Sequence, residues 1–180
     1  MVDLLALLTG ALANPFVYFL LVFGLAILIA IILPIPIEIV LLLPLDPNLS
    51  MPIGQRLNLF SVALVAVALG KAVGAWLVFL FGLKVEKSIT KWTERSKAFR
   101  RFVAALEKFV RRTGTMGLYI LLSIPLMSDT AVLYFYALFN EEGKALEQRH
   151  FILSNFLAGV NRVALVFILG LTLIPGLLTP

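Results

Sequence analysis

The sequence contains no cysteine, a single histidine and few charged side chains. Without cysteine there is no disulfide framework, no thiolate chemistry and no Cys-ligated zinc or iron–sulfur site. His150 alone offers little for metal chemistry, so we expect neither a metal nor another cofactor. Charged residues make up 14% of the 180 residues and hydrophobic ones 61%, against about 25% and 45–50% in soluble domains. This composition excludes an ordinary soluble domain and predicts an all-α integral membrane protein.

Basic residues are concentrated in one stretch. The chain has 15 Lys and Arg against 10 Asp and Glu, and ten of these basic residues lie in Lys84–Arg112 beside three acids. On an apolar chain such an excess suits an anionic membrane surface rather than nucleic acid. Apolar residues recur among them at helical spacing, so residues 84–113 are predicted to form an amphipathic helix that lies on the inner leaflet and anchors the protein there.

Three apolar runs are candidates for membrane-spanning helices. Residues 16–33 form an uncharged run of about 27 Å as a helix, close to the hydrocarbon thickness. Residues 59–83 form the second run, with Lys71 near the centre, and residues 151–174 form the third, with Arg162 inside it. The sequence therefore predicts three transmembrane helices.

Two proline-broken segments separate these runs. Residues 34–58 include Pro34 and Pro36, and residues 117–140 include Pro125. Their apolar pieces are too short to cross a bilayer, and proline removes amide donors and interrupts helices. Each segment is therefore predicted to enter the membrane and turn back as a re-entrant hairpin.

The two halves of the chain echo each other. Glu38 follows Pro34 by four residues, and Asp129 follows Pro125 by four. This spacing predicts two repeats of inverted topology, an arrangement common among secondary transporters. We expect a single membrane domain over 1–180 with its N-terminus cytoplasmic and its charge-free C-terminus outside. Its parts are an interfacial segment at 1–14, a first repeat at 16–83, the basic helix at 84–113 and a second repeat at 114–175.

Four charged residues fall inside the predicted membrane segments: Glu38, Lys71, Asp129 and Arg162. Each charge at the bilayer centre costs about 2.5–3.5 kcal/mol on insertion scales, which favours a polar cavity. In the functional hypothesis Glu38 and Asp129 exchange protons, while Lys71 and Arg162 bind an anionic headgroup. In the alternative, static pairs of Glu38 with Lys71 and of Asp129 with Arg162 lock the hairpins to the spans.

The remaining candidates have structural explanations beside functional ones. The proline breaks form turns, and they also place free helix ends near a ligand. Gly70 and Gly74 favour close helix packing, and His150 is expected to be a solvated interfacial residue. The polar candidates for helix contacts or cavity lining are Ser123, Ser128, Asn155 and Asn161. An intramembrane hydrolase would need a nucleophile elbow, a His-rich metal motif or a phosphate-binding glycine loop, and the sequence has none of these, so we expect no enzyme activity.

The order of these motifs resembles the DedA superfamily, which includes the SNARE-associated or VTT-domain membrane proteins. The resemblance covers about residues 21–169. It rests on the proline-rich segment with Glu38, Ala68-Leu69-Gly70 through Gly74 to Phe79 and Gly82, the basic helix, Ser123-Ile124-Pro125 through Asp129, and Gly159 with Arg162. The stretch Tyr119–Thr130 also looks like the small multidrug export proteins.

The resemblance implies two opposed re-entrant hairpins that meet in mid-membrane, in a multi-pass protein of a prokaryotic cell membrane. It implies translocation of lipids, polyprenyl phosphates included, with a role for proton motive force and with Glu38 as the embedded acid. The chain departs from the family at Ser123 and Ser128, where many members have arginines that suit phosphate, and at Ala75, where an acid or amide is frequent.

The resulting prediction is a proton-linked lipid or lipid-phosphate translocase whose partners are anionic membrane lipids and protons, not nucleic acid. A homo-oligomer is left open. The sequence is also compatible with two alternative functions. One is a proton-coupled small multidrug exporter, which would not depend on Arg162. The other is a non-transporting membrane assembly factor, which would not depend on the carboxylates.

Overall fold

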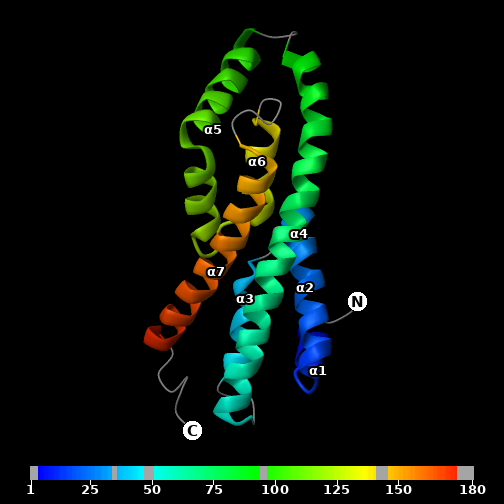
Figure 1. Ribbon diagram of the computed structural model, residues 1–180, viewed down its shortest axis with the longest axis vertical. Coiled ribbons are helices and arrows are strands. Elements are labelled where there is room, and N and C mark those ends of the chain that lie inside the picture. Colours follow the sequence, from blue (N-terminus) through cyan, green and yellow to red (C-terminus); the bar gives the residue numbers. More distant parts are fainter. Residues whose placement is uncertain (1–3, 34–35, 47–50, 94–96, 141–145, 174–180) are drawn as a thin grey trace.

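The computed structural model describes residues 4–33, 36–46, 51–93, 97–140 and 146–173, and every regular element in these ranges is a helix. The helices form an elongated bundle (Figure 1). In chain order they are α1 (Leu4–Ala11), α2 (Pro15–Ile31), α3 (Glu38–Leu42), the 3₁₀ helix η1 (Leu43–Leu45), α4 (Ile53–Thr93), α5 (Lys97–Ser123), α6 (Asp129–Leu138) and α7 (Gln148–Leu173). The all-α prediction is confirmed for the described residues.

Helix α2 begins at a well-formed cap. The Asn14 side chain accepts hydrogen bonds from Phe16 N (3.0 Å) and Val17 N (3.4 Å), and Pro15 occupies the first turn, where its missing amide donor is not needed. The helix then rises to the middle of the bundle, where the chain reverses and descends through α3 and η1 (Figure 1). Pro34, a predicted breaking residue, lies outside the described residues.

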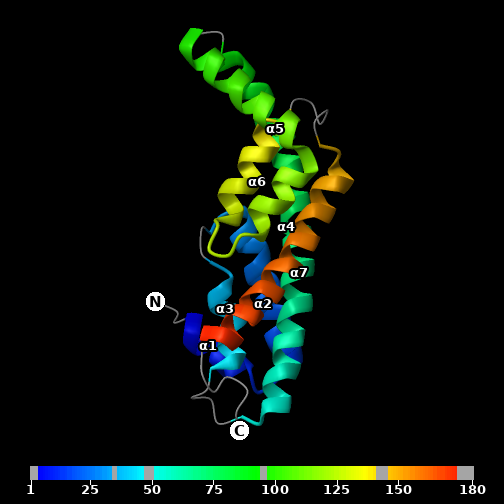
Figure 2. The same ribbon diagram turned by 90° about the vertical axis from the view of Figure 1, so that its left-hand side faces the viewer.

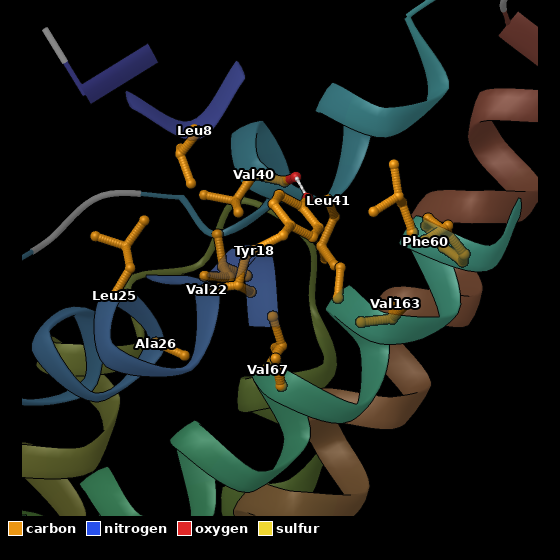
Figure 3. Close-up of a cluster of buried hydrophobic side chains, with 14 of the residues drawn as sticks. Leu8, Tyr18, Val22, Leu25, Ala26, Val40, Leu41, Phe60, Val67 and Val163 are labelled. Atoms are coloured by element: carbon orange, nitrogen blue, oxygen red, sulfur yellow. Dashed lines mark hydrogen bonds between the residues drawn. The ribbon is translucent and has the colours of Figure 1, made fainter. Parts of the chain in front are cut away.

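The descending segment is fastened to α2 by a buried tyrosine. Tyr18 Oη donates a hydrogen bond of 3.2 Å to the carbonyl of Val40. Around this bond α1, α2, α3, α4 and α7 contribute apolar side chains, among them Leu8, Val22, Leu41 and Val163 (Figure 3). The reversal between α2 and α3 therefore has its own hydrophobic core.

Helices α2 and α4 lie side by side and run in the same direction. A Cβ placed on Gly70 would lie 2.7 Å from Ala26 Cβ, and one on Gly74 would overlap Ala30. The residue numbers of the contacting pairs increase together on both helices, from Ala26 with Gly70 to Ala30 with Gly74, so the helices are parallel. The start of α2 and the end of α4 therefore lie at opposite ends of the bundle (Figure 1). The expectation that the N-terminus shares a side with the basic segment is wrong.

The second half of the chain runs through similar elements in the opposite sense. Helix α5 descends, the chain turns at residues 124–128, α6 rises and α7 descends (Figures 1 and 2). Gly114, at φ 50° and ψ −142°, interrupts α5 in a conformation that glycine tolerates best. Helix α7 is antiparallel to α4, since Phe151 packs on Phe79 and Phe167 on Phe60.

Two helices are long and apolar enough to cross a membrane, over Ile53–Phe81 of α4 and Gln148–Leu169 of α7. Helix α2, expected as a third span over 16–33, has 17 residues and ends in the middle of the bundle. The second predicted span begins at Ile53 rather than at residue 59, so the expected hairpin over 34–58 has only α3 and η1 as its helical part.

The basic segment is divided between two helices. Helix α4 continues unbroken to Thr93, and α5 starts at Lys97, so the expected single helix over 84–113 is wrong in its boundaries. The end of α4 and the start of α5 lean away from the bundle together (Figure 2). The backbone of 84–93 and 97–103 is helical, and the side chains of these residues lie outside the described part of the structure.

Candidate functional site

The four charged residues of the predicted membrane segments come together at one place. Glu38 belongs to α3, Lys71 to α4, Asp129 to α6 and Arg162 to α7. They are only 1–5% exposed. Contacts between residues separated by up to 124 positions therefore build a single buried charge cluster, which we define as these four side chains.

Asp129 is the central acid of the charge cluster. Its Oδ1 and Oδ2 lie 3.2 Å and 3.1 Å from Lys71 Nζ, and its Oδ1 lies 3.0 Å from Arg162 Nη1. One carboxylate thus pairs with two cations. Because both partners are fully buried, the loss of this acid would leave two positive charges facing a single acid, Glu38.

Arg162 connects the acids to the turn between α5 and α6. Its Nη2 donates hydrogen bonds to the carbonyls of Ile124 (2.6 Å) and Met127 (3.0 Å), while its Nε lies 3.6 Å from Glu38 Oε1. A guanidinium suits this position because its donors spread in a fixed plane and reach several acceptors at once.

Glu38 links the two halves of the chain. Its Oε1 accepts a hydrogen bond of 3.0 Å from Leu126 N, 88 positions away. Its Oε2 is buried and makes no hydrogen bond with any described residue. A carboxylate oxygen without a partner is unfavourable in an apolar interior, so this atom can accept a hydrogen bond from an incoming donor.

The start of α6 places Asp129 by local chemistry. The side chain of Ser128 caps the helix, with Ala131 N donating to Ser128 Oγ at 3.3 Å. The next residue, Thr130, donates to the carbonyl of Leu33 at 3.2 Å and also bonds that of Ile29. These carbonyls at the end of α2 have no continuing helix to supply their donors. Thr130 thus joins the end of α2 to the start of α6.

One face of α7 carries Arg162 and packs against Lys71 of α4. Asn155, Gly159 and Arg162 recur at spacings of four and three, which places them on one side of a helix. Asn155 Nδ2 donates to the carbonyl of Lys71 at 2.6 Å, and a Cβ on Gly159 would lie 3.2 Å from Lys71 Cδ. The glycine therefore leaves room for the lysine side chain.

The charge cluster lies near the middle of both candidate spans. Lys71 and Arg162 are each within about 6 Å, measured along the helix axis, of the midpoint of their span. Of the two hydrophobic clusters in the described residues, one includes Val67 and the other Ala75, on either side of Lys71 along α4. Apolar packing above and below thus isolates the charges from water.

Two other predicted site residues, Ser123 and Ser128, form hydrogen bonds with backbone atoms outside the charge cluster. Ser123 Oγ donates to the carbonyl of Tyr119 in its own helix at 2.7 Å, and Ser128 caps α6. Asn161 is half-buried on α7, and it is Asn155 that contacts Lys71. Pro36 and Pro125 lie within the two chain reversals, between α2 and α3 and between α5 and α6.

Two further sequence expectations concern the pairing of the buried charges and the surroundings of His150. Of the two alternative pairs, Asp129 with Arg162 is present at 3.0 Å. The pairing of Glu38 with Lys71 is wrong, because among the described residues Glu38 pairs with Arg162 and Lys71 with Asp129. His150 is solvent-exposed and lies 3.5 Å from Glu147. The described residues contain no group of three or more His, Cys, Asp or Glu side chains placed to hold a metal.

Sequence reasoning missed the roles of Thr130 and Leu126. Thr130 directly follows Asp129, but nothing in the sequence indicates that it reaches α2. Leu126 contributes its backbone amide, and a backbone contact leaves no sign in the type of residue. Both contacts depend on the two chain reversals meeting in space.

Comparison with known protein families identifies the family of this chain. Residues 47–173 match the VTT domain. This range contains Lys71, Asp129 and Arg162, whereas Glu38 precedes it. No curated protein and no solved structure matches the chain. The match covers well over half of the 180 residues, and the chain therefore belongs to the VTT-domain family of the DedA and SNARE-associated membrane protein superfamily.

Proposed function

We propose that this VTT-domain protein translocates lipids with anionic headgroups, polyprenyl phosphates among them, between the leaflets of the membrane, and that a proton takes part. The observation that carries the proposal is the buried charge cluster near mid-span. Its four charges come from both halves of the chain and meet where each half reverses direction. Ionisable residues at this depth mark a substrate or proton path in many membrane proteins.

The proposed membrane arrangement follows the helix directions. Helices α4 and α7 span the bilayer, while α2 with α3, and the second half of α5 with α6, enter from opposite sides and turn back. The two halves then form an inverted repeat with the charge cluster between the reversals. With the basic residues of 84–113 in the cytoplasm, the start of α2 and the end of α7 face outward.

A phosphate group fits the charges of the cluster. Arg162 can donate to phosphate oxygens as it now donates to backbone carbonyls and pairs with Asp129, and Lys71 adds a second cation. With two acids and two bases, the cluster is neutral when every group is ionised. An added anion would leave a net negative charge in a medium of low dielectric, where such charge is costly.

Proton uptake offsets that added charge. Glu38 Oε2, which is buried and has no hydrogen bond with any residue that the structure describes, is the acceptor in this proposal. Protonation of Glu38 weakens its attraction to Nε of Arg162 and leaves more of the positive charge for the headgroup. Binding of an anionic headgroup is thereby linked to binding of a proton.

The test is redistribution of fluorescent lipids in liposomes that contain the purified protein. Phosphatidylcholine, phosphatidic acid and polyprenyl phosphate analogues are compared across pH, with Glu38→Gln and Asp129→Asn beside the unsubstituted chain. Glu147→Gln removes a carboxylate from an exposed site and serves as the matched control.

We expect pH-dependent redistribution of anionic lipids that Glu38→Gln makes insensitive to pH, that Asp129→Asn abolishes and that the control retains. Redistribution no faster than in empty liposomes for all three lipids would refute lipid transport. Retained, pH-dependent transport in Glu38→Gln would refute the proton role of Glu38 alone.

A further inference from the structure

The turn between α5 and α6 covers the charge cluster at the side of the bundle. Ile124 and Leu126 are 44% and 73% exposed, whereas Arg162 and Glu38, which the same turn contacts, are 1% and 5% exposed. Both figures show this turn near the middle of the long axis (Figures 1 and 2). Exposed aliphatic side chains at mid-depth of a membrane protein face acyl chains rather than water.

Three hydrogen bonds fasten the turn to the cluster. Arg162 Nη2 donates to the carbonyls of Ile124 and Met127 at 2.6 Å and 3.0 Å, and Leu126 N donates to Glu38 Oε1 at 3.0 Å. The carbonyl oxygens thus occupy guanidinium donors that a phosphate oxygen would use. An oxyanion that binds Nη2 must displace them.

The closed turn is held in an unfavourable backbone conformation. Leu126 has φ 64°, the one positive φ of a non-glycine residue among the described parts of the chain. Residues with a Cβ disfavour this region, whereas glycine enters it readily. The hydrogen bonds to Arg162 and Glu38 hold Leu126 there together with the bond of 3.3 Å from Met127 N to the Ile124 carbonyl within the turn. Loss of the bonds to the charge cluster therefore favours opening.

We propose that the turn of residues 124–127 is a lateral gate between the acyl-chain region and the charge cluster, and that a phosphate headgroup opens it by replacing the Ile124 and Met127 carbonyls on Arg162. This gate rests on the proposed function and adds the route of entry. A sideways opening lets the headgroup reach Arg162 while the acyl chains stay in the bilayer.

The opening can be measured directly because the chain has no cysteine of its own. Nitroxide labels at Ile124→Cys and Leu157→Cys, both exposed positions, report the separation of the turn from α7 by double electron–electron resonance. Labels at Leu80→Cys and Leu157→Cys, which join α4 to α7, form the control pair. The protein is placed in nanodiscs of phosphatidylcholine, with or without phosphatidic acid.

We expect a single distance in phosphatidylcholine and a second, longer distance when phosphatidic acid is present. The control pair should keep one distance in both discs. Inorganic phosphate added to phosphatidylcholine discs should produce no second distance, because the route runs from the lipid side. If inorganic phosphate alone opens the turn, entry is from water and the lateral gate is refuted.

Two substitutions of Leu126 test the backbone conformation itself. Leu126→Ala and Leu126→Gly both remove the exposed side chain, but only alanine keeps the penalty for positive φ. The open population in phosphatidic acid should be about five-fold smaller in Leu126→Gly than in Leu126→Ala. Equal populations in the two variants would refute the role of Leu126 as the strained part of the gate.

The distance measurement does not depend on transport. A lipid-dependent second distance without lipid redistribution would support the gate and refute the proposed translocation. Lipid redistribution with one unchanged distance would support translocation and refute the gate.

Discussion

Lys71 and Asp129, 58 positions apart, form a buried ion pair in which both carboxylate oxygens lie within 3.2 Å of the lysine nitrogen. Asp129 also contacts Arg162 at 3.0 Å, so the pair is part of a three-membered bridge between α4, α6 and α7. Its three helices are joined through one carboxylate, and this arrangement makes the acids unequal in their effect on stability.

Asp129→Asn should destabilise the fold more than Glu38→Gln. Removing the charge of Asp129 leaves two buried cations with a single acid, for which about 3–5 kcal/mol is typical. Glu38 lies 3.6 Å from Arg162 and accepts one amide hydrogen, so its neutral isostere should cost about 1–2 kcal/mol. Reversible unfolding in mixed micelles measures both. A larger effect for Glu38→Gln would contradict the central position of Asp129.

Alanine at Gly70 or Gly74 should force α2 and α4 apart. At Gly70 the new Cβ would meet Ala26 and the Phe23 carbonyl, and at Gly74 it would meet Ala30. Such overpacking costs about 1–3 kcal/mol. Gly24→Ala is the control, because its Cβ would meet nothing within 4 Å on the same helix pair. Thermal unfolding in detergent should show a lower Tm for Gly70→Ala and Gly74→Ala, with Gly24→Ala unchanged or higher. Equal Tm values for all three would show that the helices separate freely.

Thr130→Val should loosen the contact between the two chain reversals. Valine keeps the shape of threonine but removes the hydroxyl that bonds the carbonyls of Ile29 and Leu33. The loss should cost about 1–2 kcal/mol, because buried carbonyls lose a donor. Thr130→Ser keeps the hydroxyl and should retain more of the stability. Unfolding of the two variants in the same detergent distinguishes the hydrogen bond from the packing of the methyl group.

The sequence predicted the members of the charge cluster but only some of their partners. The free-energy cost of placing a charge inside the bilayer distinguishes four residues in the sequence: Glu38, Lys71, Asp129 and Arg162. The structure brings all four together. The partners depend on how the helices are placed in space. Arg162 lies between both acids because α7 passes the point where the reversal between α2 and α3 meets the reversal between α5 and α6. The hydropathy of the sequence does not predict where α7 lies relative to these reversals.

Helix direction was the main structural feature that hydropathy could not give. A run of apolar residues at 16–33 has the length of a span, so the sequence predicts that α2 crosses the membrane. The contacts of Gly70 with Ala26 and of Gly74 with Ala30 show the parallel orientation. The small-residue spacing was visible in the sequence, but its partner helix and direction were not.

Arg162→Lys should separate the charge of Arg162 from its geometry. Lysine retains the positive charge near Asp129 but cannot also reach Glu38 and the carbonyls of Ile124 and Met127, which the planar guanidinium contacts together. We expect a loss of about 1–3 kcal/mol for Arg162→Lys and about 3–5 kcal/mol for Arg162→Gln, which leaves the acids without this cation. Denaturant unfolding in bicelles provides the comparison. If Arg162→Lys is as stable as the unsubstituted chain, the hydrogen bonds to the turn contribute nothing and only the charge matters. If both variants lose stability equally, the geometry of the guanidinium outweighs its charge.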